Sequence, residues 1–308
     1  MFSMQKLSKL SFIFDFSEKN SPVLRLKTGE EISIETMDCF SDQIRTDEDR
    51  LENMDWKKIN PATGPVYVEG SHSGDALKVT IKKIILKDRA VLATGRDLGV
   101  LGDRIDGLRS KTVKITNGKV IFDEKLSIPV KPMIGVIGVA PKGQAINCGT
   151  PGSHGGNMDN TMIGEGAVLY LPVFVEGALF ALGDLHAVMG NGEIGVSGAE
   201  VAGDVLVKIE IVKKAGLKNP IVETSNAIAT VASAKTLDEA AEMAVHDMEA
   251  ILSPAIGKTT DETAMLLSLV ANVEICQVVD PMKTARFVLP KWVLERYGKG
   301  IMDLVKAK

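Results

Sequence analysis

Ala167-Val-Leu-Tyr-Leu-Pro-Val-Phe-Val175 and Ala178-Leu-Phe-Ala-Leu182 are two apolar segments near the middle of the chain. Branched and aromatic residues fill both segments, and short runs of this kind are typical of buried β-strands. Glu176-Gly177 lies between them and predicts a two-residue turn. Together they predict a β-hairpin at the centre of a β-rich fold.

The N-terminal part of the chain continues this β pattern. From Leu7 to about Val130, short segments rich in Val, Ile and Thr alternate with polar turns. Asp75-Ala-Leu-Lys-Val-Thr-Ile-Lys82 alternates as a half-buried strand does, and Asn117-Gly118 has the favoured composition of a hairpin turn. These segments predict a β-sandwich or jelly roll.

Helical patterns occur only in the C-terminal third. Thr236-Leu-Asp-Glu239 is a capping-box pattern, and Thr259-Thr-Asp-Glu262 opens a second helical segment. Val205-Leu-Val-Lys-Ile-Glu-Ile-Val212 predicts a strand before these helices, whereas Val273-Glu-Ile-Cys-Gln-Val-Val279 and Ala285-Arg-Phe-Val-Leu289 predict strands after them. We therefore expect an all-β middle region and an α+β C-terminal third, packed as one unit.

Composition limits the class of protein. Of 308 residues, 45% are hydrophobic, enough for a sizeable core. The formal net charge of -4, from 36 basic and 40 acidic residues, argues against a nucleic-acid-binding protein. The three cysteines form no CxxC motif, which favours a reducing cytoplasm. The apolar run Leu10-Ser-Phe-Ile-Phe14 predicts a strand and not a signal peptide, and no segment has the length of a membrane span.

Two glycine-rich loops carry the main chemical signal. Gly152-Ser-His-Gly-Gly-Asn-Met-Asp159 contains one imidazole and one carboxylate, and Gly183-Asp-Leu-His-Ala-Val-Met-Gly-Asn-Gly-Glu193 contains Asp184 and His186. The predicted hairpin between the loops would bring them to one end of a sheet. Because side chains alternate along an extended segment, Asp184 and His186 are expected to project to the same face.

These groups match the ligands of a catalytic metal site. Zinc accepts imidazole nitrogen and carboxylate oxygen and keeps one position open for water in catalytic sites; the candidate ligands are His154, Asp159, Asp184 and His186. A metal-activated water attacks an amide carbonyl, and Glu193 is then a candidate proton shuttle to the leaving amine. An alternative interpretation is that these side chains only shape turns and that Glu193 is a solvated loop carboxylate.

Other candidate residues carry a weaker signal. His72 lies in a Ser/Gly loop and is interpreted as an exposed turn residue, whereas His246 lies in a predicted helix, at its surface or at an interface. Gly190-Asn-Gly192 lacks the strand, loop and helix setting of a phosphate-binding loop. Cys148 is interpreted as a small buried thiol and not as a nucleophile.

Several motifs resemble the core signature of acetamidases/formamidases. They are His154-Gly-Gly-Asn-Met-Asp159, Tyr170-Leu-Pro-Val-Phe-Val-Glu-Gly-Ala-Leu179 and Gly183-Asp-Leu-His-Ala187 with Gly190-Asn-Gly-Glu193. The likeness extends to Gly64-Pro-Val-Tyr-Val-Glu-Gly70 and Gln277-Val-Val-Asp-Pro281, and it covers nearly the whole chain. Where relatives commonly have Gln-Gly-Asp-Gly-Glu, this chain has Met189-Gly-Asn-Gly-Glu193, so the choice of substrate stays open.

The resemblance implies hydrolysis of formamide or acetamide to the carboxylate and ammonia. It also implies a jelly-roll β-sandwich over residues 1–130, a small β-barrel over 131–212 that carries the active-site loops, and an α+β region over 213–308. A divalent metal is implied, zinc first and calcium as an alternative. By position, Asp38 joins His154, Asp159, Asp184 and His186 as a metal ligand, and the catalytic roles fall to Glu193, Asp184 and His186.

Substrate binding is assigned to Asn157, Gly155 and Gly156, because an amide carbonyl needs hydrogen-bond donors. The partner is then a small amide, without nucleic acid or membrane, and a cytoplasmic homo-oligomer is favoured. Two alternatives stay open. One is a lactamase or another amide hydrolase on the same fold, and the other is a non-catalytic β-sandwich that binds a metal or a carbohydrate.

Overall fold

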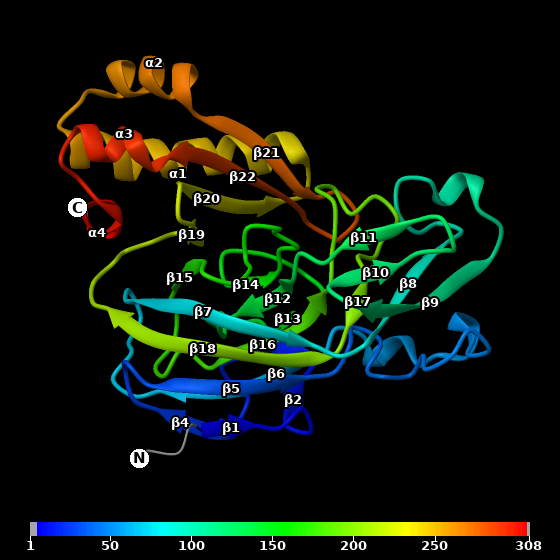
Figure 1. Ribbon diagram of the computed structural model, residues 1–308. Coiled ribbons are helices and arrows are strands. Elements are labelled where there is room, and N and C mark those ends of the chain that lie inside the picture. Colours follow the sequence, from blue (N-terminus) through cyan, green and yellow to red (C-terminus); the bar gives the residue numbers. More distant parts are fainter. Residues whose placement is uncertain (1–4, 307–308) are drawn as a thin grey trace.

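Two large β-sheets form most of the molecule, which the computed structural model describes from residue 5 to residue 306. The first sheet has nine strands, in the spatial order β1 (Gln5–Leu7), β5 (Glu31–Thr36), β18 (Gly203–Val212), β7 (Ala76–Leu86), β15 (Val168–Pro172), β19 (Ile221–Glu223), β20 (Ala227–Ala234), β22 (Lys283–Pro290) and β21 (Asn272–Gln277). Strands from the N-terminal, middle and C-terminal parts of the chain thus share one sheet (Figure 1).

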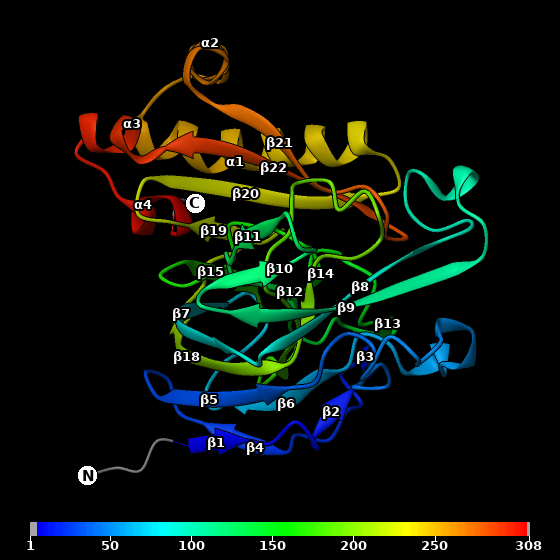
Figure 2. The ribbon, with the colours of Figure 1, turned by 45° about the vertical axis from the view of Figure 1, so that its right-hand side comes forward.

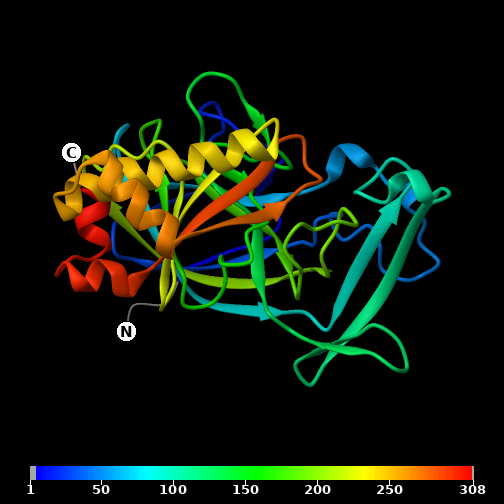
Figure 3. The ribbon, with the colours of Figure 1, turned by 90° about the horizontal axis from the view of Figure 1, so that it is seen from above.

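The second sheet has eleven strands. Its main path contains β11 (Ser127–Pro129), β10 (Lys119–Ile121), β9 (Leu108–Thr116), β8 (Arg89–Gly95), β17 (Glu200–Val201), β16 (Phe180–His186), β12 (Met133–Gly138) and β14 (Gly155–Asn157). Beside this path, β6 (Ala62–Val68) pairs with β16, β2 (Phe12–Ile13) and β4 (Leu24–Leu26), while β3 (Asp15–Phe16) and β13 (Ile146–Asn147) form a separate pair. The hairpin predicted at Asn117-Gly118 is confirmed, and β8 and β9 extend away from the helices (Figure 3).

The helices lie in the C-terminal part. They are α1 (Leu237–Ile256), α2 (Thr260–Val270), α3 (Lys291–Arg296) and α4 (Ile301–Val305), and short 3-10 turns occur at Leu51–Asn53, Trp56–Lys58 and Gly102–Arg104. Capping boxes at Thr236 and Thr259 open α1 and α2, as the sequence predicts. Figure 2 shows α1 and α2 on the outer side of β20, β21 and β22. Within residues 5–306, no helix combines the length and apolarity needed to span a membrane.

The hydrophobic core joins both sheets and then the helices. Leu171 and Ile209 of the nine-stranded sheet belong to the same buried cluster as Ile134 of the eleven-stranded sheet. A second buried cluster contains Met248 of α1 and Phe287 of β22. The predicted mostly-β fold with an α+β C-terminal part is therefore confirmed.

The centre of the chain differs from the predicted hairpin. β15 pairs with β7 and β19 in one sheet, whereas β16 pairs with β6, β12 and β17 in the other. Gly177, Ala178 and Leu179 have φ values of 75°, 58° and 56°, and these left-handed residues turn the chain from one layer to the other. The hairpin prediction is wrong because the two apolar segments find partners in different layers.

No closed barrel forms within the described part of the chain. Both sheets run as open paths, and β12, β14, β16 and β17 extend the eleven-stranded sheet, while β15 and β18 belong to the nine-stranded sheet. The barrel expected for residues 131–212 is thus replaced by two packed layers, because β15 and β16 separate after the turn at 177–179. The domain boundaries at 130 and 212 stay predictions.

Candidate active site

Strand β12 brings the two glycine-rich loops together. It lies between β14 and β16, and Val136 pairs with Asn157 on one side and with Gly183 on the other. Asp159 follows β14 and Asp184 lies within β16, so the two carboxylates reach β12 from its two neighbouring strands. The meeting of the loops therefore depends on a third strand and not on a hairpin between them.

Gly135 leaves the space in which two carboxylates meet. A Cβ atom at position 135 would lie 2.5 Å from Asp159 Oδ1 and 2.6 Å from Asp184 Oδ2, so only glycine fits without a shift. Asp159, Asp184 and Glu193 have φ values of 43°, 54° and 48°. Such left-handed conformations are uncommon in residues with a Cβ, and they concentrate at functional sites, where the surrounding structure holds them.

His186 is at the centre of a buried acidic cluster. Its Nε2 lies 3.6 Å from Asp159 Oδ1, 3.4 Å from Asp184 Oδ1 and 3.2 Å from Glu200 Oε2. All four side chains are buried. Asp184 and His186 face the same space, in keeping with their spacing in the sequence.

Two neighbouring sets of side chains have ligand atoms close enough to hold a metal ion. Within each set these atoms lie within 4.8 Å of one another; one set is Asp159, His186 and Glu193, and the other is Cys39, Asp184 and Glu200. All six residues are buried. Because His186 and Asp184 approach to 3.4 Å, the two sets adjoin.

Glu200 and Asp280 join the site although the sequence analysis did not select them. Glu200 opens β17 beside the apolar Ala199 and Val201, and an acid within an apolar strand is the signal that marks it. Asp280 comes from the loop between β21 and β22, where Gln277-Val-Val-Asp-Pro281 forms part of the family likeness. Glu200 pairs with His186 between β17 and β16, whereas Asp280 reaches the site from a loop far along the chain.

Asp38 and His154 lie outside both ligand sets. The Asp38 carboxylate accepts hydrogen bonds from the N–H groups of Phe40 and Asp42, at 3.0 and 2.8 Å, and so shapes a turn. The His154 ring packs edge-on against Phe16, with ring centroids 5.2 Å apart. Burial lowers the pKa of His154 to about 4, so its imidazole is neutral. The structure thus separates these two predicted ligands from the other three.

Burial dominates the electrostatics of the cluster. It raises the pKa of Asp159 to about 6 and that of Glu200 to about 8. It also raises the pKa of Glu193 well above its usual value, and the Asp159 carboxylate adds to that shift. For His186, burial lowers the pKa, but the carboxylates of Glu200 and Asp184 outweigh burial and hold the pKa well above its usual value. The surplus of acidic groups favours the binding of a cation in this cluster.

Several buried atoms of the cluster have no hydrogen-bond partner within residues 5–306. They are Asp159 Oδ1 and Oδ2, Asp184 Oδ1, His186 Nδ1, Glu200 Oε2 and Asp280 Oδ2. A buried polar atom without a partner costs free energy, and one divalent cation satisfies several such atoms together. Imidazole nitrogen with carboxylate oxygen suits zinc, and oxygen alone suits calcium. The donor set therefore fits a divalent metal.

Arg286 connects the acidic loops to the C-terminal part. From β22, its buried guanidinium donates hydrogen bonds to Asn160 Oδ1 at 2.6 Å and to Asn191 Oδ1 at 3.4 Å. Asn160 follows Asp159 directly, and Asn191 precedes Glu193 by two residues. One side chain therefore holds both loops that carry acidic groups of the site.

A cavity of about 360 Å³ lies against the acidic cluster. The carboxyl-bearing residues that line it are Asp184, Glu193, Glu200 and Asp280. Asn157 also lines the cavity, and its buried Oδ1 has no hydrogen-bond partner among the described residues. Gly155 and Gly156 do not line it, and the Gly155 N–H donates to Gly152 O at 3.0 Å. Of the three predicted substrate-binding residues, only Asn157 reaches the cavity.

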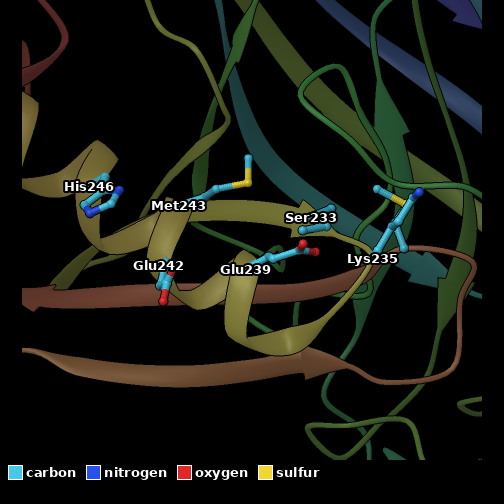
Figure 4. Close-up of a pocket in the computed structure, with 8 residues that line it drawn as sticks. Ser233, Lys235, Glu239, Glu242, Met243 and His246 are labelled. Atoms are coloured by element: carbon cyan, nitrogen blue, oxygen red, sulfur yellow. The ribbon is translucent and has the colours of Figure 1, made fainter.

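A second hollow, of about 490 Å³, lies beside α1. Figure 4 shows Glu239, Glu242 and His246 on α1, with Ser233 and Lys235 at the end of β20. None of the residues of the acidic cluster lines this hollow, and its side chains form no metal-ligand set in the described range. His246 thus belongs to a surface hollow and not to the candidate active site.

Comparison with known proteins places this fold and site. The sequence profile of the acetamidase/formamidase family matches residues 16–147 and 143–291. A solved structure described as a predicted acetamidase/formamidase from the thermophile Thermoanaerobacter tengcongensis is 60% identical, with a TM-score of 0.94 over 96% of this chain and 98% of that chain. The structure of an acetamidase from Bacillus halodurans is 42% identical, with a TM-score of 0.93 over 95% of this chain and 99% of that chain.

Similarity to curated proteins is lower. The formamidase of Methylophilus methylotrophus is 27% identical over 266 residues, which are 66% of this chain and 65% of that protein. The chain thus matches just under two thirds of the length of that relative. Fold and site define a two-layered β protein with a buried carboxylate and imidazole centre. The chain belongs to the acetamidase/formamidase family.

Gly135→Ala should disrupt the acidic cluster. The new methyl group would overlap Asp159 Oδ1 and Asp184 Oδ2, so at least one carboxylate must move. We expect the affinity for an added divalent cation, probed with zinc and measured by titration calorimetry, to fall roughly 10- to 100-fold. Gly300→Ala is the matched control, because a Cβ there meets no atom within 4 Å. Equal zinc affinity in the two variants would contradict a shared position of the two carboxylates beside Gly135.

Proposed function

We propose that this chain hydrolyses the C–N bond of an amide to a carboxylate and ammonia. The observation that carries the proposal is a single cavity whose lining combines several carboxyl groups with the Asn157 amide, on the fold of the acetamidase/formamidase family. Formamide and acetamide are the first substrates to consider, because relatives bear those names.

We infer that a divalent metal, zinc before calcium, binds in the acidic cluster. Unpaired buried carboxylate oxygens of Asp159, Asp184 and Glu200 support this inference. His186 Nε2 lies 3.2 to 3.6 Å from one such oxygen of each residue. The imidazole at the centre of the cluster favours zinc, because calcium prefers oxygen ligands alone. When bound, the ion supplies a Lewis acid for the amide carbonyl.

The side chains of the cavity have separate tasks in this reaction. Asn157 orients the amide, because its Oδ1 accepts a hydrogen bond from the substrate NH₂ group and its Nδ2 donates to the carbonyl. Glu193 takes a proton from the attacking water and passes it to the leaving nitrogen. A C–O bond forms, the C–N bond breaks, and the nitrogen leaves as ammonia. Asp184 and His186 hold the geometry around the reacting group.

A cyclic amide is the competing substrate class. The same side chains would open a lactam ring, and a cavity of about 360 Å³ has room for one. Ring opening retains the nitrogen in the product, so product analysis separates a lactamase from an enzyme that releases ammonia.

We also propose that the protein works in the cytoplasm as a homo-oligomer. All three cysteines are buried and unpaired, which suits a reducing compartment. Met265 and Leu269 of α2 are 61% and 83% exposed, and such apolar side chains suit contact with a second copy of the chain. Light scattering on the purified protein tests the assembly, and the mass of a single chain would contradict it.

Ammonia release is the direct test of the proposed reaction. We expect purified protein to release ammonia from formamide or acetamide, to lose this activity on stringent chelation, and to regain it with one added ion that elemental analysis also finds in the untreated protein. Ammonia release by fully metal-free protein would contradict the metal inference and retain the hydrolase. Ring opening without ammonia release from linear amides would favour a lactamase, and an absence of all turnover would favour a binding protein.

Glu200→Gln should separate metal binding from folding. Near pH 7 the metal-free variant should be about as stable as the wild type, because burial raises the pKa of Glu200 to about 8 and its carboxyl group is already largely neutral there, as the amide of glutamine is. Zinc at 100 times its Kd should raise the free energy of unfolding of the wild type by about 2.7 kcal/mol. We expect less than half of that gain in Glu200→Gln, measured by urea denaturation with and without zinc. Glu124→Gln, at an exposed position, is the control, and an equal gain in both variants would contradict Glu200 as a ligand.

A further inference from the structure

We propose that the cavity beside the acidic cluster is an acyl-binding pocket, and that this chain prefers neutral amides with an apolar acyl group of roughly four to eight carbon atoms over formamide and acetamide. This inference rests on the proposed amide hydrolysis and specifies its substrate class.

Apolar side chains from separate loops line much of this cavity. They include Phe40, Trp56, Ile59, Leu98, Val196 and Pro281. The acidic cluster contributes the carboxyl groups of the same cavity. Carboxyl groups and an apolar wall thus share one space. This arrangement is suited to a substrate whose amide group binds at the carboxyl groups and whose acyl chain binds along the apolar wall.

The charges of the lining select for a neutral acyl group. Within the described residues, no lysine, arginine or histidine lines the cavity, and its acidic residues carry carboxyl groups apart from the Cys39 thiol. An acyl chain that ends in a carboxylate would lose hydration against the apolar wall and would find no lysine or arginine there as a counter-ion. The pocket therefore disfavours amides of dicarboxylic acids.

The cavity is larger than formamide or acetamide requires. A water molecule takes up about 30 Å³ of liquid, so a cavity of about 360 Å³ corresponds to on the order of ten water-sized groups. Formamide or acetamide would leave most of the apolar wall in contact with water. A longer acyl chain covers that wall, and each buried methylene should strengthen binding roughly fourfold.

A single turn couples the pocket to a carboxyl group of the site. The Val196 N–H donates to Glu193 O at 3.0 Å, so these two residues close one turn, and both side chains line the cavity. Val196 has a φ of 80°, a conformation that is rare for a β-branched residue. Strained residues of this kind persist where the surroundings hold them and cluster at functional sites. Here the strained backbone keeps an isopropyl group against the cavity.

Trp56 lines the pocket and is also open to solvent. Its side chain is 40% exposed and belongs to the short turn Trp56–Lys58, which Asp55 caps. Just beyond this turn, the Asn60 N–H donates to Cys39 O at 2.7 Å, which attaches the segment to a residue of the second ligand set. An acyl chain that extends from the acidic cluster along the apolar wall would contact Trp56.

A series of amides tests the inference on the full-length, metal-loaded protein. We expect kcat/KM to rise roughly fourfold per added methylene from acetamide through butanamide to hexanamide, with succinamate at least about tenfold below butanamide. A flat or falling series in an enzyme that turns over acetamide would overturn the acyl pocket and leave the proposed function intact. Absence of turnover with every amide would contradict the proposed function. Calorimetry with benzamide and acetamide would then test the pocket alone. Weaker binding of benzamide than of acetamide would overturn the acyl pocket.

Two pocket variants and one control complete the experiment. Trp56→Ala and Val196→Gly should each lower the ratio of kcat/KM for hexanamide to that for acetamide by roughly fivefold or more. Because Val196→Gly also relieves the backbone strain, the melting temperature of this variant should not fall. A loss of the preference for hexanamide in this stable variant would then result from the change in the pocket and not from unfolding. Trp292→Ala, at a 53% exposed position of α3 outside the cavity, should leave the ratio unchanged. Unchanged ratios in both pocket variants would overturn the inference.

Discussion

The gathering of buried carboxyl groups around the His186 imidazole is the constraint on which the rest of the structure depends. Charges without partners are costly in a protein interior, and an acidic cluster expands unless rigid elements hold it. Here β12 lies between the strands that deliver Asp159 and Asp184, and Gly135 leaves room for both carboxylates. The left-handed backbone of those two residues completes the restraint. Strands of one sheet thus carry Asp184, His186 and Glu200, and the loops that bear Asp159, Glu193 and Asp280 are held against those strands.

The C-terminal α+β part completes this site. The Gly192 N–H donates to Cys276 O at 2.8 Å, and the Val278 N–H donates to Gly192 O at 3.1 Å. Arg286 adds a side-chain link to the two acidic loops, and Asp280 enters the cavity from the loop between β21 and β22. Helices α1 and α2 cover the outer side of the strands that carry these residues (Figure 2). The C-terminal helices pack on the strands that hold the two acidic loops, and so they help to fix acidic groups that occur much earlier in the sequence.

Local sequence patterns predicted the helices and strands well, but they did not predict which strands pair with one another. The capping boxes of α1 and α2 and the Asn117-Gly118 hairpin depend on residues that are neighbours in the sequence, and all three are present. The segments 167–175 and 178–182, which contribute to β15 and β16, are apolar throughout, so their pattern specifies burial but not the sheet in which each strand lies. For the same reason the middle of the chain forms two layers where a hairpin and a barrel were expected.

The sequence by itself determined a β-rich chain with an α+β end, two glycine-rich loops that bear acids and imidazoles, and a shared direction for Asp184 and His186. Alternation along an extended segment predicts that last result, and the left-handed backbone at Asp184 sets the final direction of its side chain. Only the tertiary structure decided that His154 packs against Phe16, that Asp38 shapes a turn, and that Cys39, Glu200 and Asp280 complete the centre. Except for the local turn at Asp38, these contacts join residues from different strands and loops. Their geometry depends on strand order and on the space left at Gly135, neither of which is encoded in a local pattern.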